Sequence, residues 1–271
     1  MKLTVQGRVA HAYTGGKTFD ATLPCVVFVH GALNDHSVWT LLARWFAHHG
    51  HAVLALDLPG HGQSEGPPLP SVEASADWLL AVLDAAGVQQ AALAGHSMGS
   101  LIVLEAAARA PQRATRLVMI GTAYPMKVSD ALLATARDRP LAAIDMVNGF
   151  SISTHAAKPS YPGPGMSLHG SNRALMRRTL AGCPPLDGRN LFEHDFRVCD
   201  AYAGGLQAAA RVRCPAILVL GSNDQMTPPK VTKDLAAALK ARVLTLDSGH
   251  SLMAEQPDAM LAAMRTALAP G

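Results

Sequence analysis

The stretch Leu93-Ala94-Gly95-His96-Ser97-Met98-Gly99-Ser100 is the most informative part of this 271-residue chain. It places Gly-x-Ser-x-Gly directly after an apolar run and directly before a segment with helical spacing. A turn this tight between a strand and a helix has no room for large side chains, so Gly95 and Gly99 flank the serine. We therefore expect Ser97 at the tip of the turn, in a strained backbone conformation and with its hydroxyl lifted clear of the sheet.

Short apolar runs alternate with helix-period segments on both sides of this turn. This alternation is typical of a mostly parallel sheet covered by helices, so the expected fold class is α/β. The predicted strands are Leu3–Val5 and Val9–Tyr13 as an entry hairpin, then Cys25–His30, Ala52–Leu58, Ala91–Gly95, Arg116–Gly121, Ala216–Gly221 and Val243–Leu246. The predicted helices between and after them are Val38–His49, Ser71–Ala86, Ser97–Arg109, Lys230–Leu239 and a last helix that begins around Pro257.

The strand pattern stops between residues 124 and 211. Helical pieces replace it, at Asp130–Arg137, Leu141–Val147, Arg173–Leu180 and Asn190–Ala210. A segment of this length is too long for a plain connection between two strands. We predict a core domain of residues 1–123 and 212–271, with residues 124–211 inserted as a helical cap over the carboxyl edge of the sheet.

Composition narrows the class of protein. The chain is 49% hydrophobic and 16% charged, and its net charge of +3 is not gathered in any basic run. Nucleic-acid binding and stable membrane insertion are therefore not expected. The amino terminus lacks a signal-peptide core, and the four cysteines lack metal-ligand spacing. We expect a cytoplasmic protein with free thiols, no metal and no cofactor, while the oligomeric state stays open.

Four motifs in a fixed order resemble the α/β-hydrolase superfamily, specifically its capped esterases, monoacylglycerol-type lipases and carbon–carbon bond hydrolases. They are His30-Gly31-Ala32, Asp57-Leu58-Pro59-Gly60-His61-Gly62-Gln63-Ser64, the serine turn, and the carboxyl-terminal pair Gly221–Pro229 and Ser248-Gly249-His250-Ser251. The resemblance spans the whole chain and is weakest across residues 124–211. It implies the α/β-hydrolase fold with an inserted helical cap, and it leaves the substrate open.

The candidate catalytic residues are Ser97, Asp224 and His250. A serine hydroxyl is a weak nucleophile unless a base takes its proton, and His250 follows the last predicted strand on a glycine-containing turn. Asp224 follows the strand before it, which gives the chain order Ser, Asp, His expected for this fold. The loop after Arg116–Gly121, which some relatives use for the acid, has no carboxylate until Asp130.

An oxyanion hole needs two backbone donors. One is the N–H of Met98, the residue after the nucleophile. By resemblance Ala32 supplies the other, with Leu33 as the alternative. The residues expected to support this centre are His30, Gly31, Gly95, His96 and Gly99. Asp57 is expected to organise the backbone of its own turn instead.

Several apolar residues are candidates for a substrate pocket. The inserted segment offers Met126, Met146, Phe150, Met166, Met176 and Phe196, and flanking loops offer Leu33 and Met226. Packing within a small core of the inserted segment is the alternative explanation for each of them.

A serine at the turn points to acyl transfer, so we expect a serine hydrolase that cleaves a small-molecule carboxylic ester or related acyl substrate. A second hypothesis is a carbon–carbon bond hydrolase, whose dienoate carboxylate would need basic groups such as Arg173, Arg177, Arg178 or Arg197. A third is a ligand-binding member of the fold without useful turnover.

Overall fold

The computed structural model describes residues 1–153, 166–184 and 186–269. Within these ranges a single eight-stranded sheet has the order β1-β2-β4-β3-β5-β6-β7-β8. The strands are β1 (Lys2–Val5), β2 (Arg8–Tyr13), β3 (Cys25–Val29), β4 (Ala52–Leu56), β5 (Ala91–His96), β6 (Ala114–Ile120), β7 (Ala216–Gly221) and β8 (Arg242–Leu246). Strands β1 and β2 form the predicted antiparallel hairpin, and β4 to β8 run parallel to β3. The predicted α/β fold class is confirmed.

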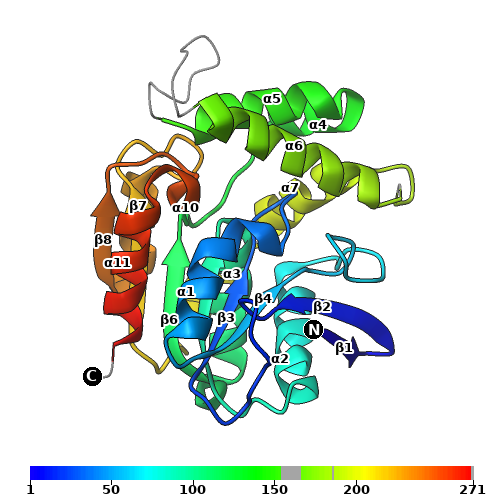
Figure 1. The fold of residues 1–271 in the computed structure, drawn as a ribbon. Helices are drawn as coiled ribbons and strands as arrows, with labels where there is room; N and C mark the ends of the chain where they lie inside the picture. The colour runs from blue at the N-terminus through cyan, green and yellow to red at the C-terminus, as the bar shows by residue number, and fades with distance from the viewer. Residues whose placement is uncertain (154–165, 185, 270–271) are drawn as a thin grey trace.

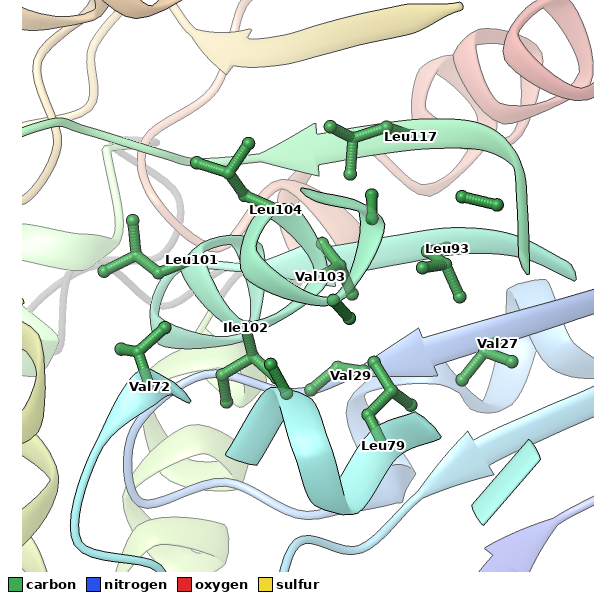
Figure 2. Close-up of a cluster of buried hydrophobic side chains, with 14 of the residues drawn as sticks. Val27, Val29, Val72, Leu79, Leu93, Leu101, Ile102, Val103, Leu104 and Leu117 are labelled. Atoms are coloured by element: carbon green, nitrogen blue, oxygen red, sulfur yellow. The ribbon is translucent and has the colours of Figure 1, made fainter. Parts of the chain in front are cut away.

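Helices cover both faces of this sheet (Figure 1). The helices of the core are α1 (Thr40–His48), α2 (Val72–Ala85), α3 (Met98–Arg109), α9 (Lys233–Ala238), α10 (Leu252–Glu255) and α11 (Pro257–Leu268). Every residue of β3 is buried, because its alternate side chains enter two different apolar clusters. Val27 and Val29 pack with α2 and α3, as Figure 2 shows, whereas Val26 and Phe28 pack with α1 and α11.

The inserted segment, by which we mean residues 124–211, is helical where the structure describes it. Its helices are α4 (Asp130–Asp138), α5 (Pro140–Ser151), α6 (Met166–Gly182), α7 (Leu191–Ala201) and α8 (Gly205–Ala209). Helices α4 to α7 lie beyond the carboxyl ends of the strands (Figure 1), and the segment has an apolar cluster of its own. None of the described helices combines the length and hydropathy that a bilayer crossing requires.

The helix predicted over Asn190–Ala210 is wrong as a single element. Helix α7 ends at Ala201 and α8 begins at Gly205. A Cβ atom on Gly205 would lie 2.4 Å from the ring of Tyr124, so the glycine lets this part of the chain pack against that ring. Helix α6 is longer than the predicted Arg173–Leu180, since it extends over Met166–Gly182.

Candidate active site

Ser97 stands at the turn between β5 and α3. Its backbone angles are φ 53° and ψ −121°, a left-handed conformation that non-glycine residues rarely adopt. The turn closes because its flanking residues have no side chain. A Cβ on Gly95 would lie 2.1 Å from the carbonyl oxygen of Gly99, and a Cβ on Gly99 would lie 2.2 Å from that of Val29. The strained, glycine-flanked turn expected from the sequence is therefore present.

His250 and Asp224 meet at the carboxyl end of the sheet. The Nδ1–H of His250 donates to Oδ2 of Asp224 at 2.8 Å, and both residues are more than nine-tenths buried. The other oxygen of Asp224 accepts the backbone N–H groups of Met226 and Thr227, each at 2.8 Å. This arrangement leaves Nε2 of His250 as the nitrogen that can accept a proton.

The surroundings of Asp224 favour its charged form. Burial alone would raise the pKa of this carboxyl. The charge and hydrogen bond of His250, together with the N–H and hydroxyl of Thr227, outweigh burial and hold the pKa well below its usual range. Asp224 is therefore an anion at neutral pH and can stabilise a positively charged His250 ring.

Thr227 is part of this site although sequence reasoning did not single it out. Its Oγ1 donates to Oδ2 of Asp224 at 2.7 Å and lies 3.2 Å from Nδ1 of His250. The sequence feature that could have identified Thr227 is its position three residues after an aspartate in a loop. An aspartate side chain in a loop commonly accepts backbone N–H groups of the residues that follow it.

Ser97 and His250 line the same cavity of about 230 Å³. The other residues that line it are Met126, Lys127, Val128, Ser129, Leu132, Met146, Phe150, Phe196, Cys199, Gln225, Met226 and Thr227. A larger cavity of about 500 Å³ lies between α1, α6 and α11 and is lined by His96, but Ser97 does not line it. We regard the smaller cavity as the candidate substrate site because the serine opens into it.

The pocket candidates from the sequence divide into three groups. Met126, Met146, Phe150, Phe196 and Met226 line the cavity with Ser97. Leu33 and Met176 do not line this cavity. Both are buried in the apolar cluster of the inserted segment, so the expectation that Leu33 lines the substrate pocket is wrong. The side chain of Met166 lies outside the part of the chain that the structure describes.

Met98 follows Ser97 directly, and the loop that carries Ala32 approaches Ser97 through Gly31. Met98 begins α3, and the first N–H groups of a helix have no partner within it. Ala32 follows Gly31 in the loop after β3. A Cβ on Gly31 would lie 3.0 Å from Cβ of Ser97, so the glycine allows this loop to approach the serine closely.

The alternative donor, Leu33, is engaged elsewhere. Its N–H donates to Oδ2 of Asp195, on α7 of the inserted segment, at 2.8 Å. Ala32 therefore remains the better candidate for the second donor, as the sequence analysis favoured.

Two further histidines hold the loops around the serine. His30 donates from Nδ1 to the carbonyl oxygen of Gly31 and accepts the N–H of Leu58 at Nε2. His96 donates from Nε2 to the carbonyl oxygen of His250 at 2.8 Å. Burial lowers the pKa of His30 to about 4 and that of His96 to about 3, so both rings are neutral at pH 7. Both ring nitrogens of His30 are engaged in loop contacts, whereas Nδ1 of His96 has no hydrogen-bond partner among the described residues.

The loop that carries His250 is also held by the end of α5. The carbonyl oxygen of Ser151 accepts the N–H groups of His250, at 2.7 Å, and Ser251. Glu255 accepts from the backbone and hydroxyl of Ser153 and from the N–H of Gly249. The inserted segment therefore contacts the loop that carries His250 as well as the loop that carries Ala32.

Asp57 has the structural role expected of it. Its carboxylate accepts the backbone N–H groups of His36 and Gln63, each at 2.8 to 2.9 Å. It also accepts Nδ1–H from the rings of His11 and His36. These three side chains are the one described group whose potential metal-ligand atoms lie within 4.8 Å of one another. The carboxylate is already saturated with hydrogen bonds, so the geometry does not call for an ion.

Comparisons with known proteins agree with this fold. Residues 24–257 match the family described as alpha/beta hydrolase fold. The Escherichia coli K12 protein named Esterase YbfF is 28% identical over 251 residues, which cover 89% of this chain and 91% of that protein. A putative non-heme haloperoxidase of Mycobacterium phage D29 is 29% identical over 255 residues, covering 90% and 86%. The crystal structure of an enol-lactonase from Burkholderia xenovorans LB400 shares the fold, with a TM-score of 0.82 and 24% identity over 99% of both chains.

The chain belongs to the α/β-hydrolase fold family, because the family match covers most of its length. It is a hydrolase of this fold, and the resemblance noted in the sequence is confirmed.

Proposed function

We propose that this protein is a serine hydrolase that cleaves small carboxylic esters through an acyl-enzyme, with Ser97, Asp224 and His250 as its triad. The observation that carries the proposal is the contact between His250 and Asp224 beside a cavity that both His250 and the strained Ser97 line. The relatives named as an esterase and an enol-lactonase support an ester or lactone substrate.

The chemistry follows from the positions of these groups. Nε2 of His250 takes the hydroxyl proton while Oγ of Ser97 attacks the carbonyl carbon of the ester. The N–H groups of Ala32 and Met98 stabilise the negative oxygen that forms. His250 then returns the proton to the departing alcohol as the C–O bond breaks. A water molecule, deprotonated by His250, attacks the acyl-enzyme and releases the acid and the free serine.

We propose that the inserted segment acts as a cap that shapes the acyl pocket. Its residues Met126, Met146, Phe150 and Phe196 form much of the apolar lining. The cavity of about 230 Å³ is below the roughly 300 to 1,000 Å³ of most ligand pockets. We therefore expect a preference for short acyl chains.

Turnover of p-nitrophenyl esters from acetate to palmitate, and of a simple γ-lactone, tests the proposal. The wild-type protein should prefer short chains, and Ser97→Ala should lower kcat by about 10⁴- to 10⁶-fold because the nucleophile is lost. Ser171→Ala, an exposed serine on α6, is the matched control and should leave turnover unchanged. Full esterase turnover in Ser97→Ala would overturn the proposal.

The arginines named for a carbon–carbon bond hydrolase lie away from the serine cavity. None of the four candidate arginines is among the described residues that line the serine cavity. Arg173, Arg178 and Arg197 pair instead with Asp145, Asp35 and Glu193, and Arg177 is exposed.

A further inference from the structure

A carboxylate of the inserted segment is buried against the loop that carries Ala32. Asp195 lies on α7 and is 2% exposed. Its Oδ2 accepts the N–H of Leu33 at 2.8 Å and a ring N–H of His61 at 2.9 Å. The two partners of Asp195 are 162 and 134 residues distant along the chain, so this single oxygen joins α7 to two separate loops of the core.

The partners of His61 define its charge. Its Nε2 faces Asp195, and its Nδ1 lies 3.1 Å from the carbonyl oxygen of Pro59. Both neighbours are acceptors, and a neutral imidazole has only one N–H to donate. The ring therefore satisfies both neighbours as the imidazolium, and the contact is a buried ion pair with each side chain 2% exposed.

The peptide planes around Ala32 are held from two directions. The carbonyl oxygen of Gly31 accepts Nδ1–H of His30 at 2.8 Å and the N–H of Asn34 at 3.3 Å. In a trans peptide the N–H points opposite to the carbonyl oxygen, so these bonds also set the direction of the Ala32 N–H. Asp195 holds the next peptide plane through the N–H of Leu33.

Leu33 makes this second anchor necessary. Its φ of 55° is a left-handed conformation that is unfavourable for a non-glycine residue. Without a partner for its N–H, the residue can relax to negative φ, and the neighbouring Ala32 peptide would turn with it. Persistent strain of this kind requires surroundings that hold it in place.

We propose that Asp195, oriented by its contact with His61, is a positioning residue that aligns the Ala32 N–H for oxyanion stabilisation. The inference rests on the proposed function. It means that the active centre is complete only when α7 is packed on the core, and α7 also supplies Phe196 and Cys199 to the serine cavity. Packing of the inserted segment on the core would thus form the acyl pocket and the oxyanion hole together.

The test compares Asp195→Ala and Asp195→Asn with His194→Ala. His194 is the neighbouring residue on α7, and its ring donates to the carbonyl oxygen of Leu69 in the core at 2.9 Å, so it is a matched contact away from the Ala32 loop. The readouts are kcat and KM for a p-nitrophenyl ester, and the inhibition constant of a trifluoromethyl ketone, whose adduct with serine places an oxyanion in the hole.

For Asp195→Ala we expect kcat to fall about 10²-fold, near the loss seen when one oxyanion donor is removed, with KM changed less than about three-fold. The trifluoromethyl ketone should bind about 10²-fold more weakly. Asp195→Asn keeps an oxygen for the N–H of Leu33 and should recover most of kcat. His194→Ala should match the wild-type protein in both readouts.

A second variant guards against misfolding, because Asp195→Ala leaves a buried ring nitrogen of His61 without its partner. The double variant His61→Phe/Asp195→Leu removes both charges and still lacks the anchor for Leu33, so its kcat should fall like that of Asp195→Ala. A double variant with wild-type kcat and ketone affinity would overturn the inference. Absence of ester turnover and of ketone binding in the wild-type protein would instead contradict the proposed function.

Discussion

At the scale of single residues, the candidate site depends on which ring nitrogen of each buried histidine carries the proton. His250 donates from Nδ1 to Asp224, His96 donates from Nε2 to the His250 loop, and His61 donates from both nitrogens. The sequence holds twelve histidines, and His250 was distinguished among them by its position after the last strand on a glycine-containing turn. The roles of the other rings follow from their partners, which no spacing in the sequence reveals.

Replacing Asp224 by asparagine tests the tautomer of His250. The amide of Asp224→Asn would donate to Nδ1 and leave the ring proton on Nε2, where it blocks proton transfer from Ser97. We expect kcat for ester hydrolysis to fall about 10⁴-fold without loss of the fold. Asp247→Asn is the control, since Asp247 lies in the adjacent loop and, among the described residues, its carboxylate bonds only to the exposed side chains of Ser222 and Asn223. A loss below ten-fold in Asp224→Asn would remove Asp224 from the triad.

At the scale of elements, the strands were predictable, whereas the boundaries of helices in the inserted segment were not. Strand β3 is a continuous run of five apolar residues between turn residues, and such a run has few alternatives to a buried parallel strand. Helix α8 begins after the end of α7 at Gly205, which packs closely against Tyr124, a residue far away in the sequence. The adjacent Gly204 and Gly205 were the available signal, because two glycines in a row weaken a helix.

The packing of α2 on the sheet gives a prediction about stability. Leu79 on α2 is fully buried and shares a cluster with Ile102 of α3 and Val29 of β3 (Figure 2). Leu79→Ala should lower the free energy of unfolding by about 2–5 kcal/mol, because the transfer energy is lost and a cavity remains. Leu41→Ala on α1, where the side chain is 66% exposed, should change it by less than about 0.5 kcal/mol. Urea denaturation measures both, and equal effects would contradict this account of the core.

At the scale of the whole molecule, the core and the inserted segment meet through contacts that have no local signature. Ser97, Asp224 and His250 each follow a strand, so parallel topology alone brings them to one edge of the sheet. Asp195 and His61 belong to no repeating pattern, and neither was predicted to lie in the site. The sheet and the candidate triad could therefore be predicted, whereas the joint between the inserted segment and the core could not.

The contact between Asp195 and His61 should make the free energy of unfolding depend on pH. Burial lowers the pKa of His61, but the charge and hydrogen bond of Asp195 and the carbonyl oxygen of Pro59 outweigh it, so the net pKa is raised. A histidine whose folded pKa is raised contributes stability below its unfolded pKa of about 6.5, and that contribution is lost as pH rises through the folded value. The other charged or titratable groups that face the His61 ring do not change their charge between pH 6 and 9. His30 is neutral, with a pKa of about 4, and Asp57 is anionic.

The variant His61→Gln isolates this contribution. The wild-type protein should exceed it in the free energy of unfolding at pH 6, and the difference should shrink as pH rises toward 9, since neutral His61 no longer forms an ion pair with Asp195. Urea midpoints at several pH values measure this difference. Other titrating groups, such as His11 and His36, are present in both proteins, so their contributions cancel in it. His48→Gln, an exposed position at the end of α1, should show no such trend. A difference between wild type and His61→Gln that is constant or grows with pH would mean that His61 is neutral in the folded protein, and that Asp195 holds the Leu33 loop without an ion pair behind it.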